Sequence, residues 1–355
     1  MYQFGEKIRF DLFGKSHADC VGGILEGLPA GVRIDETEIA EAVALRKPVA
    51  KIGTPRAEDD KVEIVQGLTD GKTDGNPLLI IIRNKNTDGS KYLKFSTTPR
   101  PGHADLPALV KFPEHDIRGG GQFSGRLTVA IVATGNICEQ FNRSFGIETA
   151  AYTSSIGNIE DKDDRSFEEA RGSRVYPTRS CTEDLDKKMY GDIVAAGNDG
   201  DSVGGTVTCI TEGLPIGFGG IWFDALDALI AKAMFGIPAC KGIEFGKGFG
   251  LGRMRGSQSN DPYYYDNGVR TRTNNMGGIV GGMSDGAPMV FRTVFKPTPS
   301  IAKEQDTVDL DRNCNDKVAV TGRHDPCIVP RAVIVVECMT ALVIADQIMK
   351  EKVME

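Results

Sequence analysis

The chain is poor in histidine and tryptophan, with four histidines and one tryptophan in 355 residues. Its eight cysteines form no C-x-x-C pair and show no spacing typical of a zinc finger. Structural disulfides and metal-binding cysteine clusters are therefore not expected. We predict reduced thiols, no metal, and a cytoplasmic location.

The sequence also has no stretch typical of membrane insertion or export. Residues 1–14 are too charged for the apolar part of a secretory signal. The longest apolar run, 332–345, contains Glu337 and is shorter than a bilayer requires. With 42 basic and 49 acidic residues the net charge is −7, which argues against nucleic acid or an anionic membrane as the main partner. Any anion site must therefore be local.

Glycine is abundant, with 43 residues, and several of these glycines belong to a pattern that occurs twice. EGLPAG at 26–31 and EGLPIG at 212–217 each follow an apolar stretch, and each precedes a helical periodicity, at 35–47 and at 222–236. Further on, DGNP and DGAP each lead into a strand, within 74–84 and 285–295. Apolar segments beginning at 125 and 330 then predict two buried helices.

These repeats predict an α+β fold in which residues 1–355 form a single domain of two related halves, about 1–150 and 195–355. A polar connector, 155–192, joins the halves. We expect a layered β-α-β sandwich with pseudo-two-fold symmetry, in which central apolar helices lie between antiparallel sheets. A ligand site is expected where the halves meet. The duplication could also be purely architectural.

All four histidines stand among polar, turn-forming residues, which makes them candidates for proton transfer. Ser16 precedes His17, and Arg100 lies three residues before His103, so these two histidines are the preferred catalysts. His115 has acidic neighbours on both sides and is expected at the surface. The fourth, His324, is expected to orient its neighbours.

Arginines gather in the same loops: Arg46, Arg56, Arg100, Arg118, Arg126 and Arg323. Guanidinium groups bind carboxylate and phosphate through two parallel hydrogen bonds, so a small polyanionic ligand is favoured over scattered surface ion pairs. The loop RGGGQFSGR, 118–126, would present backbone N–H groups to an anion, but it matches neither a dinucleotide fingerprint nor a Walker A loop. Residues 244–286 are either a mobile lid or two long hairpins.

Six segments, FGKSHAD, RPGHAD, RGGGQFSGR, ACKGIEFG, FKPTPSI and GRHDPCIVPRAV, resemble those of chorismate synthases in the same order, from residue 13 to 333. The resemblance implies a lyase of the shikimate pathway, which serves aromatic amino acid biosynthesis. It would convert 5-enolpyruvylshikimate 3-phosphate to chorismate and phosphate by 1,4-anti elimination, with reduced FMN as cofactor. It also implies a homotetramer.

The resemblance further implies roles for individual residues. His17 would protonate the departing phosphate, His103 would lie beside the flavin, and Asp325 would accept the proton through flavin N5. Ser16 and Ser124 would assist by hydrogen bonding. The substrate would be bound by Arg46, Arg56, Arg100, Arg126 and Arg323. The flavin would be lined by Gln122, Phe123, Ser124, Pro238, Ala239, Gly281, Lys296, Pro297, Thr298, Pro299, Ser300 and Arg323.

The chain departs from the common family pattern at GKSHA, at QFSGRLT and at LRKPV, so the flavin contacts near Gln122 could differ. Two alternatives remain open from the residues alone: a flavin-independent phosphate lyase, and a non-catalytic protein that binds a phosphorylated metabolite. No nicotinamide fingerprint is visible, which favours a separate flavin reductase over self-reduction with NADPH.

Overall fold

The computed structural model describes residues 2–54, 59–85, 89–112, 114–320 and 325–351. The described residues form two five-stranded sheets, four two-stranded ribbons and eight α-helices, and every strand pair in the two large sheets is antiparallel. Helices and antiparallel strands together confirm the expected α+β class.

Each sheet gathers strands from one part of the chain. The first sheet has the order β1 (Tyr2–Phe4), β2 (Arg9–Gly14), β3 (Cys20–Glu26), β7 (Leu78–Arg83) and β4 (Val62–Gln66). The second has the order β11 (Cys240–Phe245), β16 (Met289–Phe295), β10 (Gly205–Glu212), β8 (Glu148–Ile156) and β9 (Ile159–Glu160). The two-stranded ribbons are β5 (Leu68–Thr69) with β6 (Lys72–Thr73), β12 (Tyr263–Tyr265) with β13 (Val269–Thr271), β14 (Ile279–Val280) with β15 (Met283–Ser284), and β17 (Gln305–Asp309) with β18 (Cys314–Val318).

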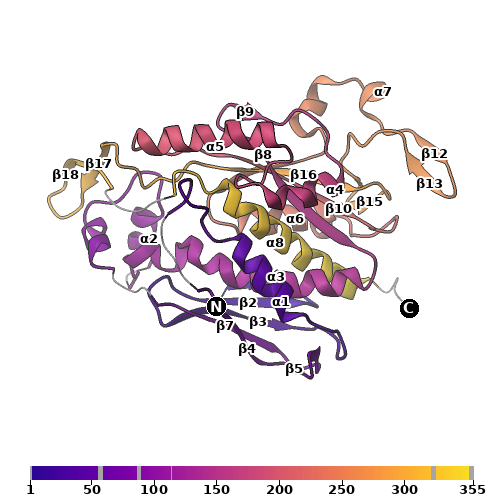
Figure 1. Cartoon of the computed structure of the whole chain (residues 1–355), viewed down its shortest axis with the longest axis horizontal. Coiled ribbons are helices and arrows are strands. Elements are labelled where there is room, and N and C mark those ends of the chain that lie inside the picture. The colour runs from indigo at the N-terminus through magenta and orange to yellow at the C-terminus, as the bar shows by residue number, and fades with distance from the viewer. Residues whose placement is uncertain (1, 55–58, 86–88, 113, 321–324, 352–355) are drawn as a thin grey trace.

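Two long helices, α3 (Thr128–Arg143) and α8 (Val329–Lys350), pack side by side between the sheets (Figure 1). α3 contacts β3 and β7, whereas α8 contacts β8 and β10. The helices approach closely at Gly135, where a Cβ atom would lie 2.2 Å from the carbonyl oxygen of Cys338. Two further helices flank this pair, α1 (Glu36–Leu45) beside α3 and α6 (Leu226–Phe235) beside α8.

α8 extends beyond the apolar run 332–345 that the sequence marked. By length and composition it could cross a membrane, with a mean hydropathy of 1.9. However, 94% of its apolar window is buried inside the fold, which is the property of a core helix. The hydrophobic effect of burying this helix holds the two sheets together.

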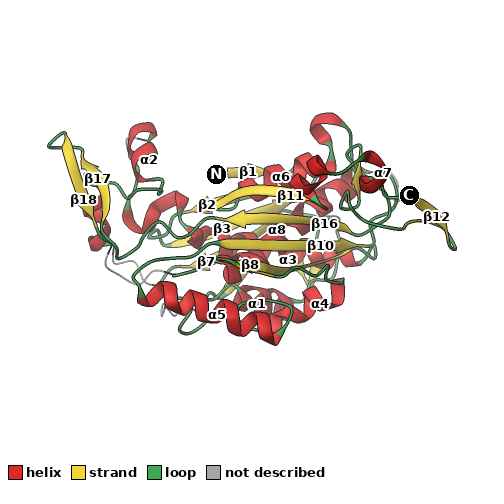
Figure 2. Cartoon of the chain, turned by 90° about the horizontal axis from the view of Figure 1, so that it is seen from above, coloured by secondary structure: helices red, strands yellow, loops and turns green. Residues whose placement is uncertain are grey.

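The polar connector carries α4 (Phe167–Gly172) and α5 (Glu183–Asn198), which lie on the other side of the second sheet from α8 (Figure 1). Residues 244–286 contain a 3₁₀ turn, a short helix and two short hairpins with strands of only two or three residues, so they do not form the two long hairpins expected as one alternative. Figure 2 shows α2 (Asp105–Lys111) and the β17–β18 hairpin at one end of the molecule, with α7 (Gly256–Ser259) and β12 at the other. The remaining helical segments are α2 (Asp105–Lys111), α7 (Gly256–Ser259), and the short 3₁₀ turns η1 (Ser90–Ser96), η2 (Arg118–Phe123), η3 (Gly125–Leu127), η4 (Ser173–Val175), η5 (Trp222–Asp224) and η6 (Gly248–Arg253).

The repeated sequence segments adopt matching hydrogen bonds. In the first sheet's turn, the Gly31 amide donates to the Thr73 carbonyl (2.7 Å) and the Thr73 hydroxyl donates to the Pro29 carbonyl (2.6 Å). In the second, the Gly217 amide donates to the Ser284 carbonyl (2.8 Å), and the Ser284 hydroxyl donates to the Pro215 carbonyl. The second sheet also takes β8 from before the connector, so the expected boundary near residue 150 falls inside a strand.

Candidate active site

Three histidines meet at the glycine-rich loop. Gly119, Gly120 and Gly121 have φ values of +58°, +81° and +53°, a backbone conformation that side chains rarely adopt. A Cβ atom on Gly119 would lie 2.2 Å from Cε1 of His17. On Gly120 it would lie 3.6 Å from Cε1 and Nε2 of His103, and on Gly121 it would lie 3.2 Å from Cε1 of His115. The loop therefore needs glycine both for its backbone shape and for the close approach of the imidazoles.

His17 stands on the short connection between β2 and β3. The amide of Ser16 donates to the Gly121 carbonyl (3.2 Å), which fixes this connection against the glycine-rich loop. His17 is 8% exposed, and its Nδ1 has no hydrogen-bond partner among the described residues. Its ring borders a cavity of about 480 Å³ that is also lined by Tyr2, Phe13, Gly14, Lys15, Ala18, Asp116 and Arg118.

His115 is not simply a surface residue. Its ring packs edge-on against Phe123, with 5.6 Å between ring centroids, and it is partly buried. Burial lowers the pKa of His115, although Asp105 and Asp116 oppose the shift. It therefore supports the loop beside the residue expected to line the flavin.

His103 belongs to a buried ion-pair cluster with Arg100 and Asp105. Its Nδ1 lies 2.6 Å from Oδ1 of Asp105, which also accepts Nη2 of Arg100 at 2.8 Å. Oδ2 of Asp105 accepts Nε of Arg100 at 2.7 Å. Burial by itself would raise the pKa of Asp105, but hydrogen bonds from Arg100 and His103, with their charges, hold it well below its usual range. This carboxylate is therefore ionised.

The segment expected to line the flavin, 296–300, lies against this cluster. Nη1 of Arg100 donates to the Ser300 hydroxyl at 3.0 Å, and Nζ of Lys296 donates to the Gly102 carbonyl. The Lys296 amide donates to the Ala239 carbonyl at 3.0 Å, and Ala239 has a φ of +70°. Residues expected to contact one cofactor, from three separate segments, are thus adjacent.

Two further predicted arginines share one buried carboxylate. Asp60 accepts Nη2 of Arg46 at 3.3 Å and pairs with Nη1 of Arg126. All three side chains are less than a tenth exposed. Nε of Arg126 also donates to the Asn84 side chain at 2.9 Å. Burial and the charge of Arg331 lower the pKa of Arg46 to about 10, against the opposing charge of Asp60.

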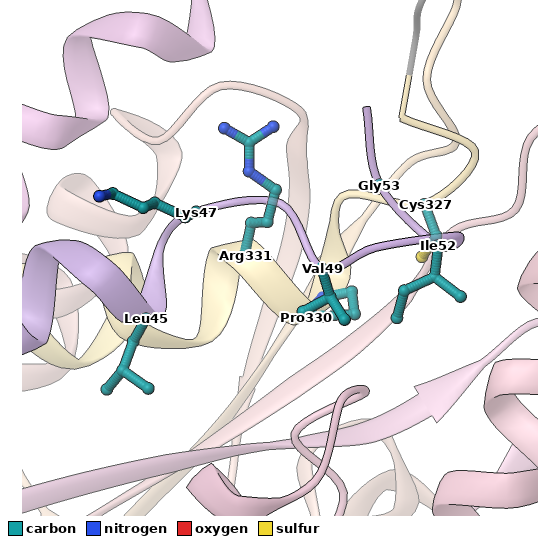
Figure 3. Close-up of a pocket in the computed structure, with 8 residues that line it drawn as sticks. All are labelled: Leu45, Lys47, Val49, Ile52, Gly53, Cys327, Pro330 and Arg331. Atoms are coloured by element: carbon teal, nitrogen blue, oxygen red, sulfur yellow. The ribbon is translucent and has the colours of Figure 1, made fainter. Parts of the chain in front are cut away.

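Asp325 lies where the N-terminus of α8 approaches the segment after α1. Oδ1 accepts the Thr54 amide at 2.8 Å, and Oδ2 pairs with Arg331, whose Nε donates to the Arg46 carbonyl at 2.9 Å. Figure 3 shows Lys47 and Arg331 beside a small cavity of about 10 Å³, room for one water at most. Its remaining lining residues are Leu45, Val49, Ile52, Gly53, Cys327 and Pro330.

Not every predicted site residue joins this region. Arg56, Arg323 and His324 lie outside the described residues. Gly281 lies in the turn between β14 and β15, and Figure 1 shows β15 on the other side of the molecule from α2. Three partners were missed from the sequence: Asp60, Asp105 and Arg331. Of these three, Asp105 and Arg331 lie within segments that carry the family resemblance, RPGHAD and GRHDPCIVPRAV, so those two could have been singled out from the sequence.

The site fits a flavin and an anionic substrate by the polar atoms that the protein leaves unpaired. Within the described residues, eleven buried side-chain polar atoms have no hydrogen-bond partner, and His17 Nδ1, Arg46 Nε and Thr298 Oγ1 are three of them. A buried polar group without a partner is unfavourable, so a ligand that bonded to these three atoms would remove that cost. All three residues were among those expected to act on, or bind, substrate or cofactor.

Comparison with known proteins places the chain in a family. A family model described as chorismate synthase matches residues 8–349. The chain belongs to the chorismate synthase family. It is 46% identical to the chorismate synthase of Korarchaeum cryptofilum, covering 98% of this chain and 97% of that protein. It is 44% identical to the chorismate synthase of Thermococcus gammatolerans, with 99% and 98% covered.

A solved structure agrees with these sequence relatives. A crystal structure of chorismate synthase superimposes with a TM-score of 0.79 at 29% identity, and the match covers 98% of this chain and 93% of that one. The predicted resemblance is therefore confirmed, and the chain is an enzyme, a lyase of the shikimate pathway. The non-catalytic alternative is not favoured.

Proposed function

We propose that the chain converts 5-enolpyruvylshikimate 3-phosphate to chorismate and phosphate by 1,4-anti elimination with reduced FMN as cofactor. The observation that carries the proposal is the meeting of His17 and His103 on a glycine-rich loop bordered by buried arginines. A substrate with two carboxylates and a phosphate matches that charge. Family membership supports the same reaction.

His17 is the proton donor to the departing phosphate in this proposal. Its imidazole borders the 480 Å³ cavity, where Lys15 and Arg118 supply positive charge and Asp116 pairs with Arg118 (2.8 Å). Lys15 has no ion-pair partner among the residues that the structure describes, so its charge is available to an anion. Phosphate leaving the ring would enter this cavity.

The flavin would lie between the glycine-rich loop and the segment 296–300. A reduced flavin supplies electron density to a substrate ring as phosphate departs. The chain would hold the cofactor with Thr298 Oγ1, Ala239, Lys296 and the Gln122–Ser124 segment, and His103 would face its ring edge. Gly281, in the β14–β15 turn, was also expected to line the flavin, but no contact described above supports that role.

Asp325 would accept the proton lost from the ring, with Ser16 and Ser124 as hydrogen-bonding assistants. Asp325 is 8% exposed and held from two sides, by Thr54 and Arg331, so its orientation is fixed before ligands bind. Arg46, Arg100 and Arg126, with Arg56 and Arg323, would bind the substrate.

We also propose a cytoplasmic homotetramer built from a duplicated, layered β-α-β unit. All eight cysteines are free, as in a reducing compartment. Trp222 and Phe223, which are 83% and 93% exposed, present large apolar side chains that suit a subunit interface. The corresponding strand orders of the two sheets support the duplication.

An anaerobic assay tests the reaction. With 5-enolpyruvylshikimate 3-phosphate and chemically reduced FMN, we expect stoichiometric phosphate and chorismate. Oxidised FMN should give neither product, whereas a flavin-independent lyase would release phosphate with both. Runs with NADPH and oxidised FMN decide whether the enzyme reduces its own flavin.

The variant His17→Ala tests the acid. We expect kcat to fall by at least ~100-fold, because general acid catalysis typically contributes 10²- to 10⁴-fold, while substrate affinity changes little. Single-turnover kinetics and equilibrium dialysis give the two quantities. The matched control is Lys162→Ala, at an exposed position in the long connection between β8 and β10. Unchanged turnover in His17→Ala would remove His17 from the mechanism.

A further inference from the structure

We infer that Asp105 is a positioning residue that holds His103 as the tautomer protonated on Nδ1, which leaves Nε2 as the ligand-facing acceptor. The catalytic consequence rests on the proposed function, whereas the tautomer itself does not. The inference rests on the buried cluster of Arg100, His103 and Asp105.

The carboxylate of Asp105 is rigidly held. It lies in the first turn of α2 and is 0% exposed. Oδ2 accepts the Arg100 amide (3.1 Å) and Nε (2.7 Å), and Oδ1 accepts Arg100 Nη2 (2.8 Å). The two parallel side-chain bonds fix the plane of the carboxylate, so Oδ1 has one direction in which to meet His103.

The contact between His103 and Asp105 determines where the proton lies. Nδ1 of His103 is 2.6 Å from Oδ1 of Asp105 and 3.1 Å from Nη2 of Arg100. A guanidinium has no acceptor, so Nδ1–H cannot donate to Arg100. An unprotonated Nδ1 would direct its lone pair at an ionised carboxylate oxygen at 2.6 Å, which is repulsive. Nδ1 therefore carries the proton and donates it to Oδ1.

The tautomer leaves Nε2 without a proton on the side of the glycine-rich loop. A Cβ atom on Gly120 would lie 3.6 Å from Nε2 of His103, and the imidazole is 20% exposed. Nε2 can thus accept a hydrogen bond from a cofactor or substrate placed against the loop. His17 differs, because its Nδ1 has no partner among the described residues.

Nitrogen-15 NMR of histidine-labelled, flavin-free protein tests the inference, because the two neutral tautomers give different ¹⁵N shifts. The His103 signals are assigned by their loss in His103→Gln. We expect protonated Nδ1 in the wild type at a pH where the imidazole is neutral. A wild-type His103 protonated on Nε2 overturns the inference, whatever any variant does.

Asp105→Asn tests the cause. The amide keeps the shape but loses the charge, so we expect a mixed or reversed His103 tautomer and kcat about 10- to 100-fold lower, with a smaller change in KM. Glu114→Gln, an exposed acid near His115, should leave the tautomer unchanged. An unchanged tautomer in folded Asp105→Asn contradicts the inference. Failure of the flavin assay with the expected tautomer would instead count against the proposed function alone.

Discussion

The two sheets differ most in the connections between their first two long strands. In the first sheet, residues 15–19 join β2 to β3 and carry Ser16 and His17. In the second, β8 and β10 are adjacent in the same antiparallel way, yet residues 157–204 join them and contain β9, α4 and α5 but no histidine. The β2–β3 connection therefore carries two candidate catalytic residues, whereas the β8–β10 connection forms a layer of helices outside the second sheet.

The turns at EGLPAG and EGLPIG, in contrast to these connections, are alike in the two sheets. Their hydrogen bonds agree group by group, down to the hydroxyl of Thr73 in one and Ser284 in the other, each bonded to the carbonyl of a proline. The two turns thus have matching hydrogen bonds, whereas His17 lies on the β2–β3 connection and the β8–β10 connection carries no histidine.

The largest effect should follow from filling the space beside His17. In Gly119→Ala, a Cβ atom would meet His17 Cε1 at 2.2 Å and would sit at a φ of +58°. The imidazole must move, so we expect kcat to fall by at least ~100-fold, since small misplacements of a catalytic group have such effects. Steady-state kinetics with reduced FMN measures it.

The matched control is Gly191→Ala in α5, within the long connection of the second sheet. Nothing lies within 4 Å of a Cβ atom there, and the backbone is helical. We expect unchanged kcat and a gain of about 0.5–1 kcal/mol in the free energy of unfolding, because alanine favours helix over glycine. Equal loss of kcat in both variants would contradict the contrast between the two connections.

The central helices differ in how their acids are paired. Glu337 of α8 bonds to Arg174 and to the Ala151 amide (3.2 Å), whereas Glu139 of α3 bonds to the Thr149 amide (3.0 Å), and its Oε2 has no partner among the described residues. Burial and the charge of Glu337 raise the pKa of Glu139 to about 8, with Thr149 and Arg143 opposing.

This pKa shift has a testable consequence for stability. The native state keeps the Glu139 proton up to about pH 8, whereas the unfolded chain releases it near pH 4.5, so stability falls as pH rises between these values. Glu139→Gln removes that dependence. We expect the free energy of unfolding of this variant to exceed that of the wild type by about 1–3 kcal/mol at pH 9 and to differ little from it at pH 4. Urea titration at the two pH values measures the difference. No difference at pH 9 would show Glu139 to be ionised without penalty.

The sequence predicted the elements that depend on local patterns. Apolar periodicity located α1, α6 and the two central helices, and turn residues located β7 and β16, because these signals depend on near neighbours. Pairings between distant residues were not predictable. Asp60 meets Arg46 and Arg126 only because the chain folds back, and no spacing of one acid from two arginines encodes that.

The candidate site shows the same limit. His17 and His103 were found by their polar context, and both reach the glycine-rich loop. His115 has a similar context, and its acidic neighbours suggested the surface, yet its ring packs edge-on against Phe123 and is partly buried. Ring packing depends on tertiary structure, so the flanking charges misled.

The smallest effects should come from the two matching turn hydroxyls, of Thr73 and Ser284, and they compare the energetics of the two turns. Thr73→Val and Ser284→Ala each remove a buried hydroxyl that donates to a proline carbonyl and accepts a backbone amide, from Val32 at 3.0 Å and from Phe218 at 3.2 Å. Each should lower the free energy of unfolding by about 1–2 kcal/mol. Thr69→Val, at an exposed hydroxyl of β5, should change the free energy of unfolding by less than about 0.5 kcal/mol.

Because the hydrogen bonds of the two turns match, urea titrations should give nearly equal losses for Thr73→Val and Ser284→Ala. A loss at only one turn would mean that the matching geometry does not reflect matching energetics.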